Sequence, residues 1–265
     1  MPQFSLQGRL GVRRLDHPVF KKPRYRACSF IITWYYILPS KRLVSKELLR
    51  VVNNSLNGGR MGLVQLLIDS GQITDPASPR GRLLDCAADL FSAKGFERTT
   101  VRDIASAVGI QSGSIFHHFK TKEEILKALM TEAVMCFTEK LKAAVDEAGD
   151  PEQKLLACIE NELLFTIGDD TVAAMSVLVS EWRCLSEGSQ REILVLREAY
   201  EQVWMDTLND AKAAGLIKGD VFIVRRLVAG AINWTPNWYR GDGALSPNDF
   251  AAEVFNIICP DAVAR

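Results

Sequence analysis

The chain has 265 residues, of which 48% are hydrophobic and 24% are charged, and its net charge is zero. This balance excludes a chain that is disordered throughout, because it contains enough apolar residues to form a core. The charge is unevenly placed: residues 1–60 carry 12 Lys and Arg against 2 Asp and Glu, whereas residues 123–265 carry 13 against 24. A basic front and an acidic rear suit a protein that places one end against phosphate groups.

The six cysteines and three histidines show no Cys-x-x-Cys pair and no spacing typical of a zinc site. This argues against a zinc site and a disulfide scaffold, and we expect neither a metal nor a cofactor. The longest apolar run, residues 27–38, is shorter than the roughly 20 residues that a membrane helix needs. We therefore expect a cytoplasmic protein without a membrane segment.

Residues 1–78 show no helical or strand period that persists for more than a turn or two. One interpretation is a basic arm that adds affinity for nucleic acid. The other, which we favour, is translated upstream sequence, with the protein starting at Met61 or nearby. Either way, we expect residues 1–78 to be a basic, disordered or additional N-terminal extension, which ends in the linker-like residues 75–79.

Beyond the linker, helical periodicity is nearly continuous, β-type alternation is absent, and glycine and proline occur mainly at breaks. These patterns predict an all-α fold. The helices are expected at about 79–95, 101–108, 111–118, 122–148, 151–168, 170–184, 188–214, 220–239 and 246–258.

Residues 100–119 read TVRDIASAVGIQSGSIFHHF, which is two short helical segments separated by Gly109. Ala105 is small enough for two crossing helices to approach each other, and Gly109 tolerates the positive φ of a sharp turn. A small core is expected from Ile104, Val108, Ile110, Ile115 and Phe119. The pattern predicts a helix-turn-helix whose second helix enters the major groove of DNA.

Residues 80–126 resemble the DNA-binding head of the TetR family of regulators. The resemblance rests on three linked motifs at fixed spacing, AxxLFxxxGFxxTT, IAxxxG and HFxxKEEIL. It implies a homodimer that binds a palindromic operator on double-stranded DNA, together with a divergent ligand-binding domain. We accordingly expect a DNA-binding domain at 79–121 and a ligand-binding and dimerisation domain at 122–265.

The resemblance also implies roles for single residues of the head. The positions that match contacts to base edges are Gln111, Ser112, Ser114 and His117. The positions that match contacts to phosphate are Thr99 or Thr100, His118 and Lys122. Phe116 stands where many members have Tyr, so one hydroxyl contact to phosphate is missing and the ring is free to pack.

The chain after residue 122 contains four of the five tryptophans. Each aromatic residue can simply fill a core, but as a set in a TetR-like body they indicate an apolar effector pocket. Its expected walls are Phe137, Phe165, Met175, Trp182, Trp204 and Trp234. Asn233 is a polar group that can orient the ligand, and Arg183 can meet an anionic group.

Residues 230–247 resemble the C-terminal region of TetR regulators of fatty-acid, sterol or aromatic-acid breakdown, which sense acyl-CoA thioesters. The resemblance implies a lipid-derived or CoA-linked effector, whose phosphates Arg183, Arg225, Arg226 and Arg240 could meet; equally, these arginines could be a solvated face. The last two helices are expected to form the dimer contact, as in the family. Its expected residues are Leu227, Ala231, Trp238, Phe250, Val254 and Ile257.

Three functions stay open at this point. The chain is a repressor that a small effector releases from DNA, a ligand-independent DNA-binding protein, or a lipid- or acyl-CoA-binding enzyme or carrier. No nucleophile–base pair, carboxylate pair or phosphate loop stands out, so we expect no enzyme. We favour the effector-released repressor.

Overall fold

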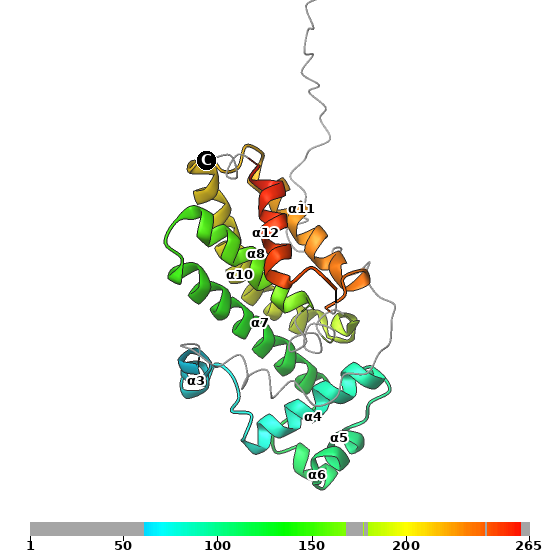
Figure 1. Ribbon diagram of the computed structural model, residues 1–265. Helices are drawn as coiled ribbons and strands as arrows, with labels where there is room; N and C mark the ends of the chain where they lie inside the picture. Colours follow the sequence, from blue (N-terminus) through cyan, green and yellow to red (C-terminus); the bar gives the residue numbers. More distant parts are fainter. Residues whose placement is uncertain (1–60, 168–176, 178–179, 242, 261–265) are drawn as a thin grey trace, which may run out of the picture.

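The computed structural model describes residues 61–167, 177, 180–241 and 243–260, and every regular element in these ranges is a helix (Figure 1). The expected all-α fold is confirmed. The helices are α3 (Met61–Asp69), α4 (Pro79–Lys94), α5 (Val101–Val108), α6 (Ser112–Ile115), α7 (Lys122–Glu147), α8 (Pro151–Ile167), η1 (Trp182–Cys184), α10 (Glu187–Ala213), α11 (Val221–Trp234), η2 (Thr235–Asn237) and α12 (Pro247–Ile258). None of them is both long and apolar enough to cross a membrane.

Helices α4, α5 and α6 form one end of the molecule, which we call the head (Figure 1). The hydroxyl of Ser78 accepts a hydrogen bond from the backbone of Gly81 and so caps α4. A reciprocal capping box of Thr100 and Asp103 starts α5. Gly109 ends α5 with a φ of 79°, in the left-handed region that favours glycine. These local signals fix where each helix of the head begins and ends.

The turn at Gly109 brings α5 and α6 together around a small core. Ile104 and Ala105 of α5 and Ile115 and Phe119 at α6 are all buried in one cluster. The cluster also contains residues of α4 and α7, so α6 is held against α5 within the common core of the head.

Helix α7 connects the head to the body (Figure 1). Near its start, Ile125, Leu126 and Met130 belong to the core cluster of the head. Farther along, Leu141 belongs to a second cluster, in the body. One helix of 26 residues therefore spans both cores, and a shift of the body against α7 reaches the head.

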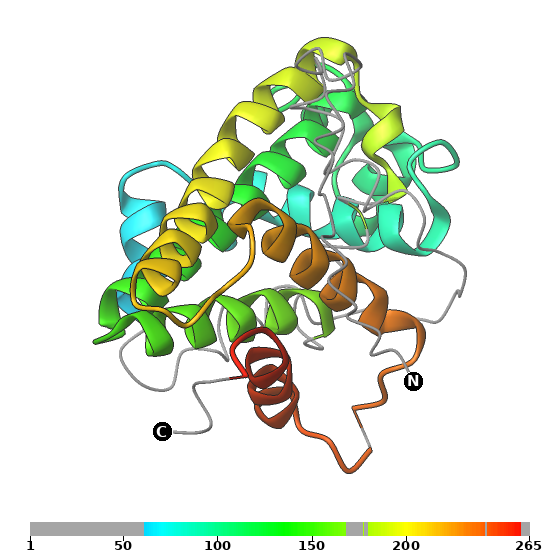
Figure 2. The ribbon, with the colours of Figure 1, turned by 90° about the horizontal axis from the view of Figure 1, so that it is seen from above.

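The body consists of the second half of α7 with α8, α10, α11 and α12. Viewed along the axis from the body end, α12 lies beside α8, and α11 crosses next to α10 (Figure 2). Its core is built from one side chain or more of each helix, such as Ile159, Trp204, Leu208, Ile232 and Phe255. The helices thus surround a single apolar interior.

Helix α3 lies where the sequence analysis predicts no element, and it packs against α7. Val64 and Leu67, one turn apart, are its buried residues. A helix of nine residues is marginal in isolation, so its stability comes from this contact and not from its own propensity. The expectation for residues 1–60 lies outside the described residues.

Two expected helices end elsewhere. The third expected helix shrinks to α6, and the residues after Ile115 form a turn in which His118 N donates to Ile115 O at 2.8 Å. Helix α11 ends at Trp234 and continues as η2, because Pro236 cannot donate a backbone hydrogen bond. Most of the helix expected at 170–184 lies outside the described residues.

Candidate nucleic-acid interface and effector site

The polar edge of α6 is open to solvent, while its apolar edge is held in the head. Ile115 and Phe119 are buried, whereas Gln111, Phe116 and His117 are exposed. His118 is exposed as well, and Ser112 and Ser114 are half-buried. Gln111 precedes α6 without a capping hydrogen bond from its side chain. The structure therefore brings the residues expected at base edges onto one accessible surface next to the turn.

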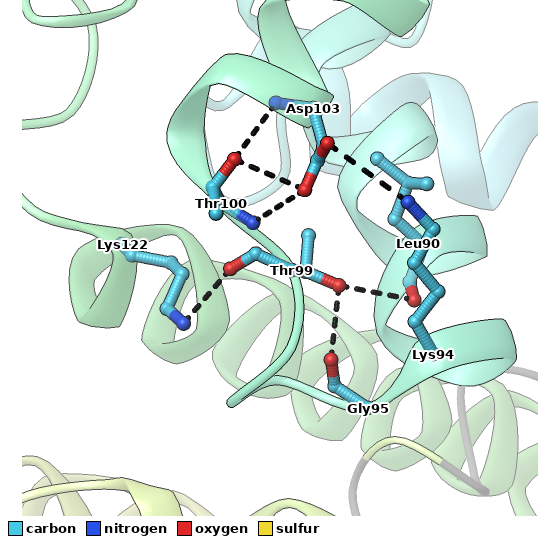
Figure 3. A network of polar contacts seen from close by, with 7 residues as sticks. All are labelled: Leu90, Lys94, Gly95, Thr99, Thr100, Asp103 and Lys122. Atoms are coloured by element: carbon cyan, nitrogen blue, oxygen red, sulfur yellow. Dashed lines mark hydrogen bonds and ion pairs between the residues drawn. The ribbon is translucent and has the colours of Figure 1, made fainter.

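Thr99 and Thr100 are neighbours with opposite roles (Figure 3). Thr100 is exposed, and its hydroxyl accepts a hydrogen bond from Asp103 N at 3.1 Å and donates one to the Asp103 carboxylate at 3.0 Å. Thr99 is fully buried, and its hydroxyl donates to Gly95 O at 2.9 Å and Leu90 O at 3.3 Å. Of the two threonines expected at phosphate, Thr99 is therefore ruled out by burial, and Thr100 keeps the position.

Asp103 carries the charge of this capping box. Hydrogen bonds from the backbone and then from the side chain of Thr100 lower the pKa of Asp103, and Lys94 lies 4.0 Å from its carboxylate. Asp103 therefore stays ionised at neutral pH, where its charge complements the amino end of α5.

Lys122 was expected to grip phosphate, but the structure places its ammonium against the protein (Figure 3). Its Nζ donates to Phe96 O at 2.6 Å and Thr99 O at 2.9 Å, and lies 4.0 Å above the centre of the Phe96 ring. The carbonyls of the loop between α4 and α5 have satisfied this cation. Lys122 thus ties the first residue of α7 to that loop, and a phosphate contact would require breaking these bonds.

The amino end of α7 is also capped by its own neighbours. The hydroxyl of Thr121 accepts from Glu124 N at 3.1 Å, and the Glu124 carboxylate accepts from Lys120 N at 2.7 Å. Next to them, Glu123 accepts from Ser186 N and Ser189 Oγ, each at 2.8 Å, which lowers the pKa of Glu123. The start of α7 is therefore joined to the start of α10 in the body.

The body contains a network of charged and polar side chains between α8, α10 and α11. Arg225, which is fully buried, donates to Glu162 at 3.1 Å and to Glu201 at 2.8 Å. The Tyr200 hydroxyl donates to Glu162 at 3.0 Å, and the Arg225 guanidinium lies 4.3 Å from the centre of the Trp204 ring. We call these five residues the Arg225 network.

The members of the Arg225 network act on one another's charges, and the buried Arg197 interacts electrostatically with four of them. Burial alone would lower the pKa of Arg225, but the charges of Glu162 and Glu201 outweigh it and raise this pKa above its ordinary value. Burial, and then the charge of Glu162, raise the pKa of Tyr200 well above its ordinary value. Arg225 is therefore always a cation here, and Tyr200 always a neutral donor. Arg225 was expected to be a phosphate ligand or a solvated residue, and the structure contradicts both roles.

The residues expected to form one effector wall lie in different places. Phe137 of α7 and Phe165 of α8 stack with ring centres 4.4 Å apart, and Trp204 is fully buried in the body core. Trp182, like Phe137, packs against the core cluster that contains the head residues, and Arg183 next to it is exposed. Phe137 and Trp182 pack against one cluster and Trp204 belongs to the other, so these residues do not line one interior.

Three further residues were expected at the effector pocket. Trp234 is 52% exposed on the outer side of α11, since the side of the helix that carries Ile232 faces the core. Asn233 next to it is half-buried. Met175 lies outside the described residues.

An apolar surface covers the outer sides of α11 and α12. Leu227 is 66% exposed and Ile257 is 76% exposed, and Ala231 and Trp238 are also exposed. Single exposed apolar residues are common, but the exposed large apolar residues of α11, η2 and α12 are Phe222, Ile223, Leu227, Trp234, Trp238 and Ile257. We call this set the α11–α12 face.

Two of the residues expected at the dimer contact are not on this face. Val254 is 8% exposed and belongs to the body core, because it lies on the side of α12 that packs against α8. Phe250 is half-buried and lies against the rings of Trp238 and Tyr239, at 5.3 Å and 5.8 Å between ring centres. Phe250 therefore packs against Trp238, which belongs to the α11–α12 face.

Two family models match the chain. The model described as "Bacterial regulatory proteins, tetR family" matches residues 83–129. The model described as "Tetracyclin repressor-like, C-terminal domain" matches residues 148–260. The first falls on the head and the start of α7, and the second on the rest of the body.

Individual proteins give the same result. The HTH-type transcriptional repressor KstR2 of Mycolicibacterium smegmatis is 29% identical over 188 residues, which are 70% of this chain and 91% of the relative. The crystal structure of a protein described as superantigen pfit superposes with a TM-score of 0.70 at 50% identity, covering 76% of this chain and 98% of that one. The ketosteroid transcriptional regulator KstR2 of Mycobacterium tuberculosis gives a TM-score of 0.60 at 27% identity, with 71% and 97% covered.

Proposed function

The chain belongs to the TetR family of transcriptional regulators, and on this premise we propose that it is a repressor that binds operator DNA as a homodimer through α6. The observation that carries the proposal is the orientation of α6. Its apolar edge is buried through Ile115 and Phe119, and Gln111 and His117 are exposed beside it. A helix held in this way can place polar side chains in a major groove without losing its own packing.

We assign the base edges to Gln111, Ser112, Ser114 and His117, and the phosphates to Thr100 and His118. The domain boundaries proposed are 79–121 for DNA binding and 122–265 for effector binding and dimerisation. A regulator of chromosomal genes acts in the cytoplasm, and this is where we propose that the chain works.

The α11–α12 face is the proposed dimer contact. It combines exposed aliphatic and aromatic residues of α11, of α12 and of the connection between them, which a second copy can cover by a twofold axis. A palindromic operator then matches the symmetry of the protein, and the distance between the two copies of α6 must match one turn of DNA, about 34 Å.

The proposed effector is apolar and lipid-derived, either free or as a CoA thioester. The names of the KstR2 relatives, one of which is described as a ketosteroid regulator, support this class. So does the body interior, where the stacked Phe137 and Phe165 lie on α7 and α8. The effector acts if it binds more tightly to a conformer whose two heads are wrongly spaced for DNA than to the conformer that binds DNA. The loss of DNA affinity is then limited by the ratio of the effector's affinities for these two conformers.

The experiment begins with selection from random double-stranded DNA on the full chain, followed by band-shift titration of the enriched sequence. We expect a palindrome. Gln111→Ala should alter the preferred bases, while Gln202→Ala, which removes an exposed glutamine of α10, should leave them unchanged. No enriched sequence, or the same preference in all three proteins, would refute the role of α6.

The effector is tested on the same complex with octanoyl-CoA, palmitoyl-CoA, a steroid acyl-CoA and the matching free acids. Release by a thioester but not by its acid supports a CoA-linked effector, whereas release by both supports the lipid moiety. A complex that none of these compounds changes would favour the ligand-independent alternative.

A second candidate function comes from the neighbour described as a superantigen, because it is 50% identical over 98% of its length. On this alternative the purified chain would drive T cells to proliferate. Proliferation of human T cells, compared with that caused by a heat-unfolded sample from the same preparation, tests it. No difference between the two samples excludes this function.

A further inference from the structure

The segment before α4 lies outside both matched family models, which begin at residue 83 and at residue 148. It is nevertheless part of the folded protein. Val64 and Leu67 of α3 are buried, and α3 packs on α7. The chain then runs down from α3 to the start of α4 (Figure 1), where Arg80 is hydrogen-bonded to His118 just after α6. This segment therefore lies between the connecting helix and the recognition helix.

The segment is fixed to α7 by a two-point contact. Both carboxylate oxygens of Glu132 accept hydrogen bonds from Thr74, one from its backbone N at 3.1 Å and one from its hydroxyl at 2.7 Å. Glu132 and Thr74 are 58 residues apart in the chain and both are half-buried. Bonds to a carboxylate are stronger than bonds between neutral groups, so Thr74 follows the position of α7.

Thr74 is in turn hydrogen-bonded to Arg80, which is hydrogen-bonded to the turn that follows α6. Arg80 Nε donates to the Thr74 hydroxyl at 3.2 Å, and Arg80 Nη1 donates to His118 O at 3.2 Å. The Arg80 guanidinium also lies 4.1 Å from the centre of the Phe119 ring. A planar guanidinium that makes directed bonds and also stacks has little freedom to move.

The backbone around this contact is closely packed. A Cβ atom on Gly81 would lie 2.2 Å from Asp75 O, so the first turn of α4 touches the preceding turn directly. Ser78 is hydrogen-bonded to both sides of this turn, through Asp75 O and Gly81 N. Arg80 therefore sits on a rigid support.

We infer that Glu132, Thr74 and Arg80 are positioning residues that set the distance and orientation of α6 relative to α7. The inference rests on the proposed function, in which α6 binds DNA. Movement of α7 in the body is then carried to α6 by this polar chain as well as by the core of the head. None of the three residues needs to touch DNA for this role.

The test compares Thr74→Val, which removes the hydroxyl at almost constant volume, with Thr74→Ser, which keeps it. Glu132→Ala removes the other end, and Glu139→Ala is its matched control, a second glutamate on α7, paired with Lys142 outside this chain of contacts. Affinity for the selected operator is measured by fluorescence anisotropy over a range of salt concentrations. Measurements are made well below the melting temperature of every variant.

We expect Thr74→Val and Glu132→Ala to weaken operator binding about tenfold, the loss that a hydrogen bond to a charged group commonly represents. Removing the negative charge of Glu132 would by itself strengthen DNA binding, so charge cannot explain a loss. Thr74→Ser and Glu139→Ala should bind at least as well as the parent protein. Because no phosphate contact is removed, the slope of affinity against salt should not change.

Amide exchange in the free protein supplies a second measurement that needs no DNA. In Thr74→Val, peptides covering residues 111–120 should exchange about tenfold faster than in the parent, because α6 has lost its restraint. Parent-like affinity and exchange in both Thr74→Val and Glu132→Ala would overturn the inference. A slope of operator affinity against salt that is lowered by about one charge in these two variants would also overturn the inference, because it would make Arg80 itself the DNA contact. A parent protein that binds no DNA would refute the proposed function, while exchange still decides this inference.

Discussion

Among substitutions of polar or surface residues in the body, Arg225→Met should lower the free energy of unfolding the most. It removes a fully buried guanidinium that bridges Glu162, whose side chain is 7% exposed, and Glu201, whose side chain is 23% exposed. Methionine fills similar space but removes the guanidinium that is hydrogen-bonded to the buried Glu162, which leaves Glu162 only its electrostatic interaction with Arg197. Breaking a buried ion pair from one side costs about 3–5 kcal/mol, and we expect the free energy of unfolding to fall by this amount at pH 7.

A second variant separates the loss of charge pairing from the loss of volume. Arg225→Met with Glu162→Gln removes both charges, while the amide oxygen can still accept from Tyr200. Glu201 is near enough to the surface to turn toward water. This double variant should recover about 2 kcal/mol of the loss, since Glu162 no longer places a buried carboxylate beside the missing guanidinium.

The assay is urea unfolding followed by circular dichroism at one fixed protein concentration, because self-association also stabilises the folded state. Arg191→Met, at an exposed pair with Glu187, is the control and should cost less than about 1 kcal/mol. A single-variant loss under about 1 kcal/mol, or a double variant as unstable as the single one, would refute the reasoning.

Three further outcomes follow from the site. Lys122→Met should lower the melting temperature and weaken DNA binding without changing the salt slope, and a slope reduced by about one charge would return Lys122 to the phosphates. Burial, and then the charge of Asp89, raise the pKa of Asp85 from 3.8 to about 6, so its ionisation costs stability as pH rises toward 6. Asp85→Asn should therefore raise the free energy of unfolding by about 1 kcal/mol at pH 7.5, a value that is discounted because the carboxyl is half exposed. The gain should vanish near pH 4, and an equal gain at both pH values would contradict this. Leu227→Asp should give a folded monomer in sedimentation velocity, and an unchanged dimer would rule out the α11–α12 face.

Most helix ends were predictable because they depend on neighbouring residues. Thr100 and Asp103 cap α5 across three residues, and Gly109 ends it, so the signal is contained in one short stretch of sequence. The same holds for the exposed edge of α6, because Ile115 and Phe119 mark its buried side at helical spacing. The TetR-like head followed from these local patterns.

Roles that depend on distant partners were not predictable. Thr99 and Thr100 are alike in sequence, and only the approach of Leu90 and Gly95 shows which one is buried. Lys122 matched a phosphate position, but loop carbonyls 23 and 26 residues earlier in the chain accept hydrogen bonds from its ammonium. The charge of a side chain can be read from the sequence, whereas the group that satisfies the charge cannot.

The sequence by itself determined that this protein is helical and where most of its helices lie from Pro79 onward, since capping and periodicity act over a few residues, and it predicts which of them faces DNA. The tertiary structure alone decided which side of α11 and α12 faces inward, that Arg225 meets carboxylates 63 and 24 residues away, and that α3 packs on α7. These features depend on which helices become neighbours. Helical periodicity identifies an apolar side of a helix but does not specify the surface that covers it.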